Sequence, residues 1–124
     1  MKKAAFSLPL ILAVLGFAGS AMAAADCVIT YHRVACTGQE ATSYAKCDGK
    51  QMCDKDNAAT TQEACIEAAK KACPNDRTDI TKAKMIYAKF KGAALVGGFN
   101  DAGAADPKGT NFCAGDRPDF NKCK

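Results

Sequence analysis

Strand-like and helix-like hydrophobic patterns alternate along this chain of 124 residues. Residues 28–34 are mostly β-branched or aromatic and include no Gly or Pro, which predicts a strand. Apolar and polar positions alternate over 84–91, Gly92 offers a turn, and 94–99 could return, so this region predicts a hairpin. The alternation puts Ile86, Ala88 and Phe90 on one side and Met85, Tyr87, Lys89 and Lys91 on the other.

A helical pattern covers 61–72, where alanine dominates the interior and Pro74 provides a stop. Thr60 followed by Glu63 has the spacing of a capping box. Glu67 and Lys71 form a well-oriented pair four residues apart. The sequence therefore predicts that this is the main helix.

Two further segments have weaker patterns. Residues 39–47 predict a short helix closed by Asp48-Gly49, with the glycine in the left-handed cap position. Residues 100–111 are rich in Gly, Asp and Ala and contain no large apolar side chain, so we expect an exposed loop.

The N-terminus has the organisation of a secretory signal peptide over residues 1–23. Two lysines precede an apolar run, and Ala21-Met22-Ala23 fits a small-x-small cleavage site. The run is shorter than the roughly 20 apolar residues that a membrane span needs. We expect a soluble domain of residues 24–124 with no membrane span after cleavage, periplasmic or secreted, in a bacterium.

All eight cysteines lie downstream of that segment: Cys27, Cys36, Cys47, Cys53, Cys65, Cys73, Cys113 and Cys123. An even number in an exported chain predicts four disulfides, with 105 possible arrangements. Cys27 and Cys36 lie too far apart along one strand to bond each other, and Cys65 and Cys73 too far apart along one helix. With a single leucine after residue 23, burial alone would stabilise the fold poorly. We predict a small, disulfide-rich, single α+β domain with one main helix packed on a short antiparallel sheet.

Charge identifies no partner class. Residues 24–124 carry a net charge of +2, and 61–92 hold a local excess of +3. A basic patch that contacts anionic glycan, phospholipid or nucleic acid is one interpretation, and a solvated lysine-rich face is the other. We favour the solvated face and expect no nucleic-acid partner, because no nucleic-acid motif accompanies these lysines.

Several catalytic classes lack their residues. No two cysteines have the C-x-x-C spacing of redox, haem or zinc motifs, and His32 is the only histidine. We therefore expect no cofactor and no metal, and interpret His32 as a surface or hydrogen-bonded strand residue. Ser43 is the only serine after residue 23 and lacks the surroundings of a nucleophile.

Carboxylates leave one catalytic alternative open. The pattern C-x-x-D-R-x-D occurs twice and contributes Asp76, Asp79, Asp116 and Asp119. Two such groups across a cleft could serve as acid and base in a small periplasmic hydrolase. Roles as turn or helix caps and as ion-pair partners of arginine explain these aspartates more simply, so the enzyme hypothesis is less favoured.

We predict a non-catalytic binding or structural module for an unknown protein or envelope component. A self-assembling cell-surface subunit is a further alternative, and the oligomeric state stays open. A rigid, cross-linked surface binds with little ordering cost. The expected interaction surface comprises Tyr87, Lys89, Lys91, Asp101, Asp106 and Lys108.

Overall fold

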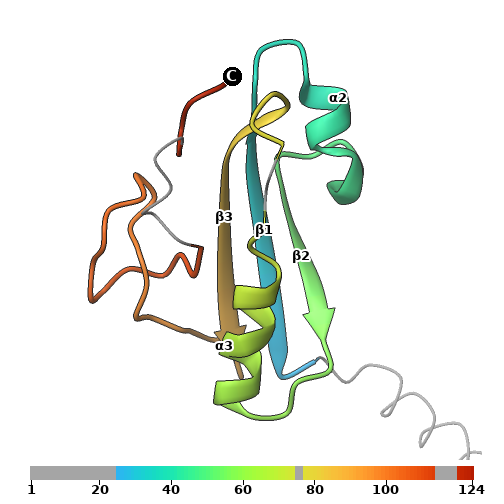
Figure 1. Cartoon of the computed structure of the whole chain (residues 1–124). Coiled ribbons are helices and arrows are strands. Elements are labelled where there is room, and N and C mark those ends of the chain that lie inside the picture. Colours follow the sequence, from blue (N-terminus) through green and yellow to red (C-terminus); the bar gives the residue numbers. More distant parts are fainter. Residues whose placement is uncertain (1–24, 75–76, 114–119) are drawn as a thin grey trace, which may run out of the picture.

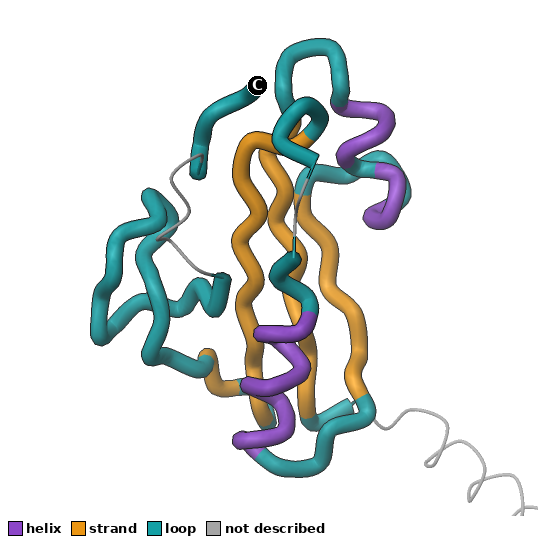
Figure 2. The backbone as a smooth tube through the Cα atoms, in the orientation of Figure 1, coloured by secondary structure: helices purple, strands orange, loops and turns teal. Residues whose placement is uncertain are grey.

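A computed structural model describes residues 25–74, 77–113 and 120–124. In it, one helix lies across one face of a four-stranded antiparallel sheet (Figures 1 and 2), which confirms the predicted α+β class. The strand order is β2-β1-β3-β4. In chain order the elements are β1 (Cys27–Ala35), α2 (Glu40–Ser43), η1 (Ala45–Cys47), β2 (Met52–Asn57), α3 (Gln62–Lys71), β3 (Thr81–Phe90) and β4 (Ala93–Ala94).

The strand predicted at 28–34 is β1, and it lies at the centre of the sheet between β2 and β3. Successive residues of a strand point to opposite faces. Cys27 is bonded to Cys65 of α3, so the odd-numbered residues of β1 face the helix. Tyr31 and Arg33 therefore belong to the helix-bearing face, and His32 belongs to the opposite face.

Helix α3 falls within the predicted range, but its cap differs from the prediction. The N-cap is Thr61, whose side chain accepts a hydrogen bond of 3.1 Å from the Ala64 amide. The expected cap at Thr60 is therefore wrong by one residue. The expected ion pair from Glu67 to Lys71 is wrong as well, since Glu67 lies 4.0 Å from Lys70 instead. Lys71 is thus left without a carboxylate partner among the described residues.

The hydrophobic core lies between α3 and the sheet. Ile86 is fully buried, as are Cys27 and Cys65. The predicted alternation in β3 is correct. The side that carries Tyr87 and Lys89 was expected to form an interaction surface, but it is partly covered, because Met85 on the same side is only 3% exposed. The core cluster comprises Cys27, Ile29, Cys65, Ala69, Ile86, Ala88, Leu95, Phe112 and Cys113.

The hairpin exists, but its return strand is short. β4 has two residues and pairs with Lys89 and Phe90 before the chain leaves the sheet. The loop expected to be exposed then returns to the core at Asn111, which is fully buried. Its side-chain oxygen accepts hydrogen bonds from the amides of Ile86 (3.1 Å) and Cys113 (2.9 Å). A buried amide side chain thus takes the place of a strand at this edge of β3, and the loop prediction fails at its C-terminal end.

Strand β2 was not predicted, because its sequence carries almost no apolar residue. It pairs with β1 from Cys27↔Asn57 to His32↔Met52. The hydroxyl of Thr30 donates a 2.7 Å hydrogen bond to Asp54 across that pair. Just before β2, the predicted short helix is divided into α2 and η1, after which both Asp48 and Gly49 have left-handed backbone conformations.

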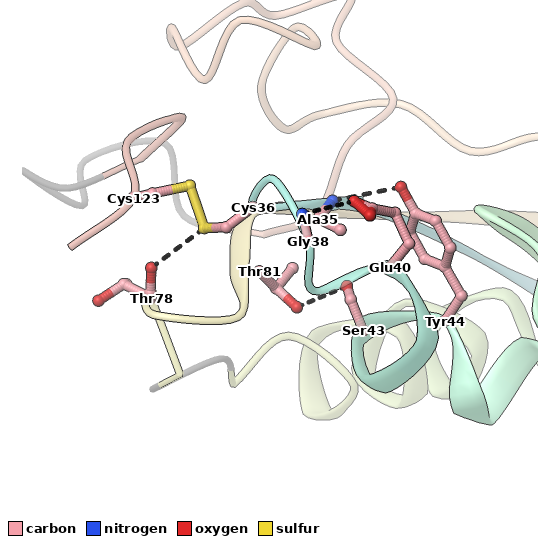
Figure 3. The surroundings of a disulfide bond; sticks show 9 residues. All are labelled: Ala35, Cys36, Gly38, Glu40, Ser43, Tyr44, Thr78, Thr81 and Cys123. Carbon is pink, nitrogen blue, oxygen red and sulfur yellow. Dashed lines mark hydrogen bonds between the residues drawn. A yellow bond between two sulfur atoms is a disulfide. The ribbon is translucent and has the colours of Figure 1, made fainter.

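All eight cysteines are paired, as predicted, in Cys27–Cys65, Cys36–Cys123, Cys47–Cys53 and Cys73–Cys113. Four disulfides in so small a domain are typical of a protein that matures in an oxidising compartment. Figure 3 shows how Cys36–Cys123 ties the end of β1 to the C-terminus, beside a 2.7 Å hydrogen bond between the hydroxyls of Ser43 and Thr81. No helix within the described residues is long and apolar enough to cross a membrane, and the predicted signal peptide lies outside them.

Candidate functional site

Two cationic side chains are buried side by side on the helix-bearing face of the sheet. Arg33 of β1 and Lys84 of β3 are cross-strand partners, and they are 8% and 9% exposed. Helix α3 covers the lower half of that face in Figure 1 and ends at Lys71. Lys84 reaches the carbonyl of Pro74, which follows the end of the helix, so the two cations lie beyond the part of the face that α3 covers.

The contacts of these cations are aromatic, carbonyl and sulfur groups. The Arg33 guanidinium carbon lies 5.3 Å from the Tyr31 ring centroid, and the Lys84 ammonium lies 5.9 Å from the same centroid. Lys84 donates a 3.1 Å hydrogen bond to the Pro74 carbonyl, and Arg33 donates one of 3.6 Å to the Cys47 sulfur. In the part of the chain that the structure describes, neither cation has a carboxylate partner. This is unusual, because buried charges are normally paired.

A cavity of about 540 Å³ opens beside the two buried cations. An adjoining hollow of about 440 Å³ shares Arg33, Lys46, Pro74 and Lys84 with it. We call the two together the cationic pocket. The first part is lined by Tyr31, Arg33, Lys46, Lys55, Lys71, Ala72, Pro74 and Lys84, and the second adds Thr42, Ser43, Arg77, Ile80 and Thr81. Six of these residues are basic and none is acidic.

Burial and mutual repulsion leave the charged form of Lys84 poorly stabilised. Removal from water is the main cause that lowers its pKa to about 8, and the nearby charges of Arg33 and Lys46 lower it further. Burial also lowers the pKa of Arg33, although the Tyr31 side chain opposes that shift. A negatively charged ligand in the pocket would stabilise both cations, whereas a positively charged ligand would be repelled by them.

Anion binding is therefore the chemistry that this arrangement supports. Arginine offers a planar fork of N–H donors that matches phosphate, sulfate and carboxylate groups, and lysine adds a compact positive charge. The one serine hydroxyl in the lining, that of Ser43, is engaged with Thr81. No group of His, Cys, Asp and Glu side chains suited to a metal ion occurs within 25–74, 77–113 and 120–124.

The surface expected from the sequence lies elsewhere. Tyr87 is on the face of the sheet opposite α3, and its hydroxyl donates a 2.5 Å hydrogen bond to Asp101. Burial, reinforced by that bond, raises the pKa of Tyr87. Asp106 accepts a hydrogen bond from the amide of Lys108, within the same loop. Lys89, Lys91 and Lys108 are exposed. None of the six residues of the expected interaction surface lines the cationic pocket, and that surface stays a prediction.

Only one of the four aspartates considered for catalysis lies within the described residues. Asp79 is exposed and pairs with Arg77 at 3.3 Å, and that hydrogen bond is the main cause that lowers the Asp79 pKa. This is the structural role that the sequence favoured for it. Asp76, Asp116 and Asp119 lie outside the described residues.

Sequence reasoning missed the cationic pocket because its residues are scattered. Lys46, Lys55, Lys71 and Lys84 come from four different elements, so they form no run or motif. The interpretation of the lysines as a solvated face is wrong for Lys84. The sequence does hold one sign of this burial. Arg33 and Lys84 continue the alternation that places Ile29 and Ile86 in the core.

Comparison with known proteins gives no assignment: no protein-family model matches the chain, and no curated protein or solved structure shows significant similarity to it. Functional inference therefore depends on the site itself.

Proposed function

We propose that this protein is an exported, non-catalytic binding protein whose cationic pocket takes a multivalent anion. The observation that carries the proposal is the burial of Arg33 and Lys84 without a carboxylate partner among the described residues. An unpaired buried charge destabilises a fold, so its presence suggests a purpose other than stability. An anionic ligand would supply the missing partner.

The pocket's dimensions and charge indicate the class of anion. A volume of about 540 Å³ falls in the range of small-molecule sites. A single carboxylate would leave most of the basic lining unpaired, whereas a ligand with two or more phosphate or sulfate groups would engage several cations. The ligand we favour therefore carries clustered phosphate or sulfate charge, either as a small molecule or as one unit of a polymer.

Disulfides hold the pocket's walls in place. Cys47–Cys53 joins η1 to β2, and these two elements contribute Lys46 and Lys55 to the lining. Cys73–Cys113 lies beside Pro74. A pocket whose walls are cross-linked before the ligand arrives loses little conformational entropy on binding.

Export completes the proposal. The four disulfides are typical of an oxidising compartment, and the signal-like N-terminus supports secretion. We propose that the protein acts in the periplasm or, after secretion, outside the cell.

The alternative functions have less support. A hydrolase needs carboxylates at its site, and none lines the cationic pocket within the described residues. A self-assembling subunit would use an open strand edge, but the edge strand β2 carries Asp54, Lys55 and Asp56, and such charges discourage edge-to-edge pairing.

Titration calorimetry of the oxidised protein with pyrophosphate tests the proposal. Lys71 and Lys70 are neighbours on α3, yet only Lys71 lines the pocket. We expect saturable binding that Lys71→Gln weakens several-fold and that Arg33→Gln weakens at least ten-fold, while the matched control Lys70→Gln changes it by less than two-fold. Absence of binding at low salt, or equal losses in both lysine variants, would refute the proposal. The same series with a sulfated oligosaccharide distinguishes a small-molecule ligand from a polymer.

A further inference from the structure

The sheet face opposite α3 carries a second set of ligand-type side chains. His32 of β1 has Met52 of β2 as its partner on one side and Met85 of β3 on the other. These are the only histidine and the only two methionines after residue 23. The sheet register thus places them in one row, which we call the Met-His-Met row.

All three side chains belong to the same face. Directly paired residues of neighbouring strands share a face, with Cβ atoms about 4.5–5.5 Å apart. A methionine side chain is long and flexible enough to bring its sulfur beside a neighbouring imidazole across that gap. Two thioethers and one imidazole are therefore within reach of a single bound ion.

Burial differs along the row in a way that suits a binding site. Met85 is 3% exposed, His32 is half-buried, and Met52 is 48% exposed. An ion would meet Met52 first and could then be held by the two inner side chains. A large apolar side chain with this exposure is also uncommon here, because only Met52 and Val96 are so exposed within the described residues.

His32 supplies an independent sign that a ligand is missing. Its Nδ1 atom is buried and has no hydrogen-bond partner, a condition that only one other buried side-chain atom shares in the described part of the chain. The expectation that His32 is a surface or hydrogen-bonded residue is therefore wrong for this atom. The neighbouring Tyr87 ring, with its centroid 6.5 Å from that of the imidazole, directs its hydroxyl to Asp101 instead. An unsatisfied buried nitrogen is costly, and coordination to a metal would satisfy it.

The donor set selects the metal. Thioether sulfur is a soft ligand that favours Cu(I), and imidazole also suits copper. All eight cysteines are consumed in disulfides, so Met52 and Met85 supply the only soft sulfur donors after residue 23. Harder ions prefer oxygen ligands, which this row does not offer.

We propose that the Met-His-Met row binds one Cu(I) ion through the sulfurs of Met52 and Met85 and the imidazole of His32. The site lies on the face opposite the cationic pocket and uses none of its residues. Copper binding can therefore be tested independently of the proposed anion binding.

Competition with a coloured Cu(I) chelator under anaerobic conditions, using oxidised protein of residues 24–124, tests the site. We expect one equivalent of Cu(I) to be withdrawn from the chelator, and at least ten-fold weaker binding in Met52→Leu and in His32→Gln. Lys89→Gln is the matched control, because Lys89 is exposed on the same face of β3 and offers no soft donor. Met52 is about half exposed, so its variant should keep the fold. An intact mass eight hydrogens below the reduced value checks the disulfides.

A second readout is the pair of methionine methyl signals in carbon-detected NMR during titration with Ag(I), a redox-inert substitute. Both signals should shift together and saturate at one equivalent. Failure to compete with the chelator, equal binding in the variants and wild type, or a shift of the Met52 signal alone would overturn the proposal.

Discussion

Replacement of Lys84 by methionine should stabilise the protein and weaken anion binding at the same time. Methionine is also unbranched, is one heavy atom shorter than lysine, and carries no charge. The fall of the Lys84 pKa from 10.5 to about 8 corresponds to a penalty of about 3 kcal/mol on the charged folded form, at about 1.36 kcal/mol per pKa unit. We reduce this figure by about half, because the ammonium borders an open pocket and solvent screens it.

The hydrogen bond that this variant loses costs little. Its acceptor is the carbonyl of Pro74, an exposed residue, so we expect water to replace the lysine as the donor. We therefore expect the free energy of unfolding at pH 7 to rise by about 1–2 kcal/mol, in line with replacements of buried charges by apolar groups of similar volume. Pyrophosphate affinity should fall at least ten-fold, because the ligand loses one of the two buried cations.

Urea denaturation followed by circular dichroism measures the stability change, provided that the slope of the transition is unchanged. Lys89→Met is the matched control on the same strand, where the lysine is exposed and the change should stay within about 0.5 kcal/mol. A loss of more than about 1 kcal/mol in Lys84→Met would show that the buried ammonium stabilises the fold. Unchanged pyrophosphate affinity would show that Lys84 does not contact the ligand.

Three further predictions use other parts of the structure. The folded-state pKa of Lys84 lies below its unfolded value, so the unfolded chain binds this proton more tightly. The free energy of unfolding should therefore rise with pH between about 8 and 10.5, by about 1 kcal/mol from pH 7 to pH 9, and this rise should vanish in Lys84→Met. Thr61→Ala should cost about 1 kcal/mol in urea denaturation through loss of the helix cap, and Thr60→Ala should cost less than about 0.5 kcal/mol; the reverse order would contradict the observed cap. Asn111→Ala should lower the free energy of unfolding by about 3 kcal/mol, because it leaves two buried amides without an acceptor. Asn100→Ala removes two similar hydrogen bonds at an exposed site and should lower it by about 1 kcal/mol or less, so equal losses would argue against the bridging role of Asn111.

The strongly patterned elements were predictable because local chemistry determines them. The β-branched run of β1 and the alanine-rich stretch of α3 each favour one conformation, and their apolar sides form the core. Strand β2 lacks any such pattern. Its conformation depends instead on its pairing with β1 and on the Cys47–Cys53 disulfide. The buried role of Asn111 depends on a contact with Ile86 that lies 25 residues away in the chain.

The candidate sites were less accessible to sequence reasoning than the fold. A motif search finds ligands that are close in sequence, whereas the cationic pocket gathers its residues from several elements. The Met-His-Met row appears only when three strands are placed in register. A lone histidine without nearby ligands in the sequence predicts no metal site, and only the sheet register brings the two thioethers of the proposed site beside it.

The most direct test of the central claim is to locate a bound anion on the protein. Amide chemical-shift mapping of the ¹⁵N-labelled, oxidised protein during titration with pyrophosphate provides that location. We predict saturable shifts concentrated at Arg33, Lys46, Ala72 and Lys84, with little change at the exposed Lys89 and Lys108. Shifts that are spread over all surface lysines, or centred on the face opposite α3, would contradict the claim that the cationic pocket is an anion-binding site.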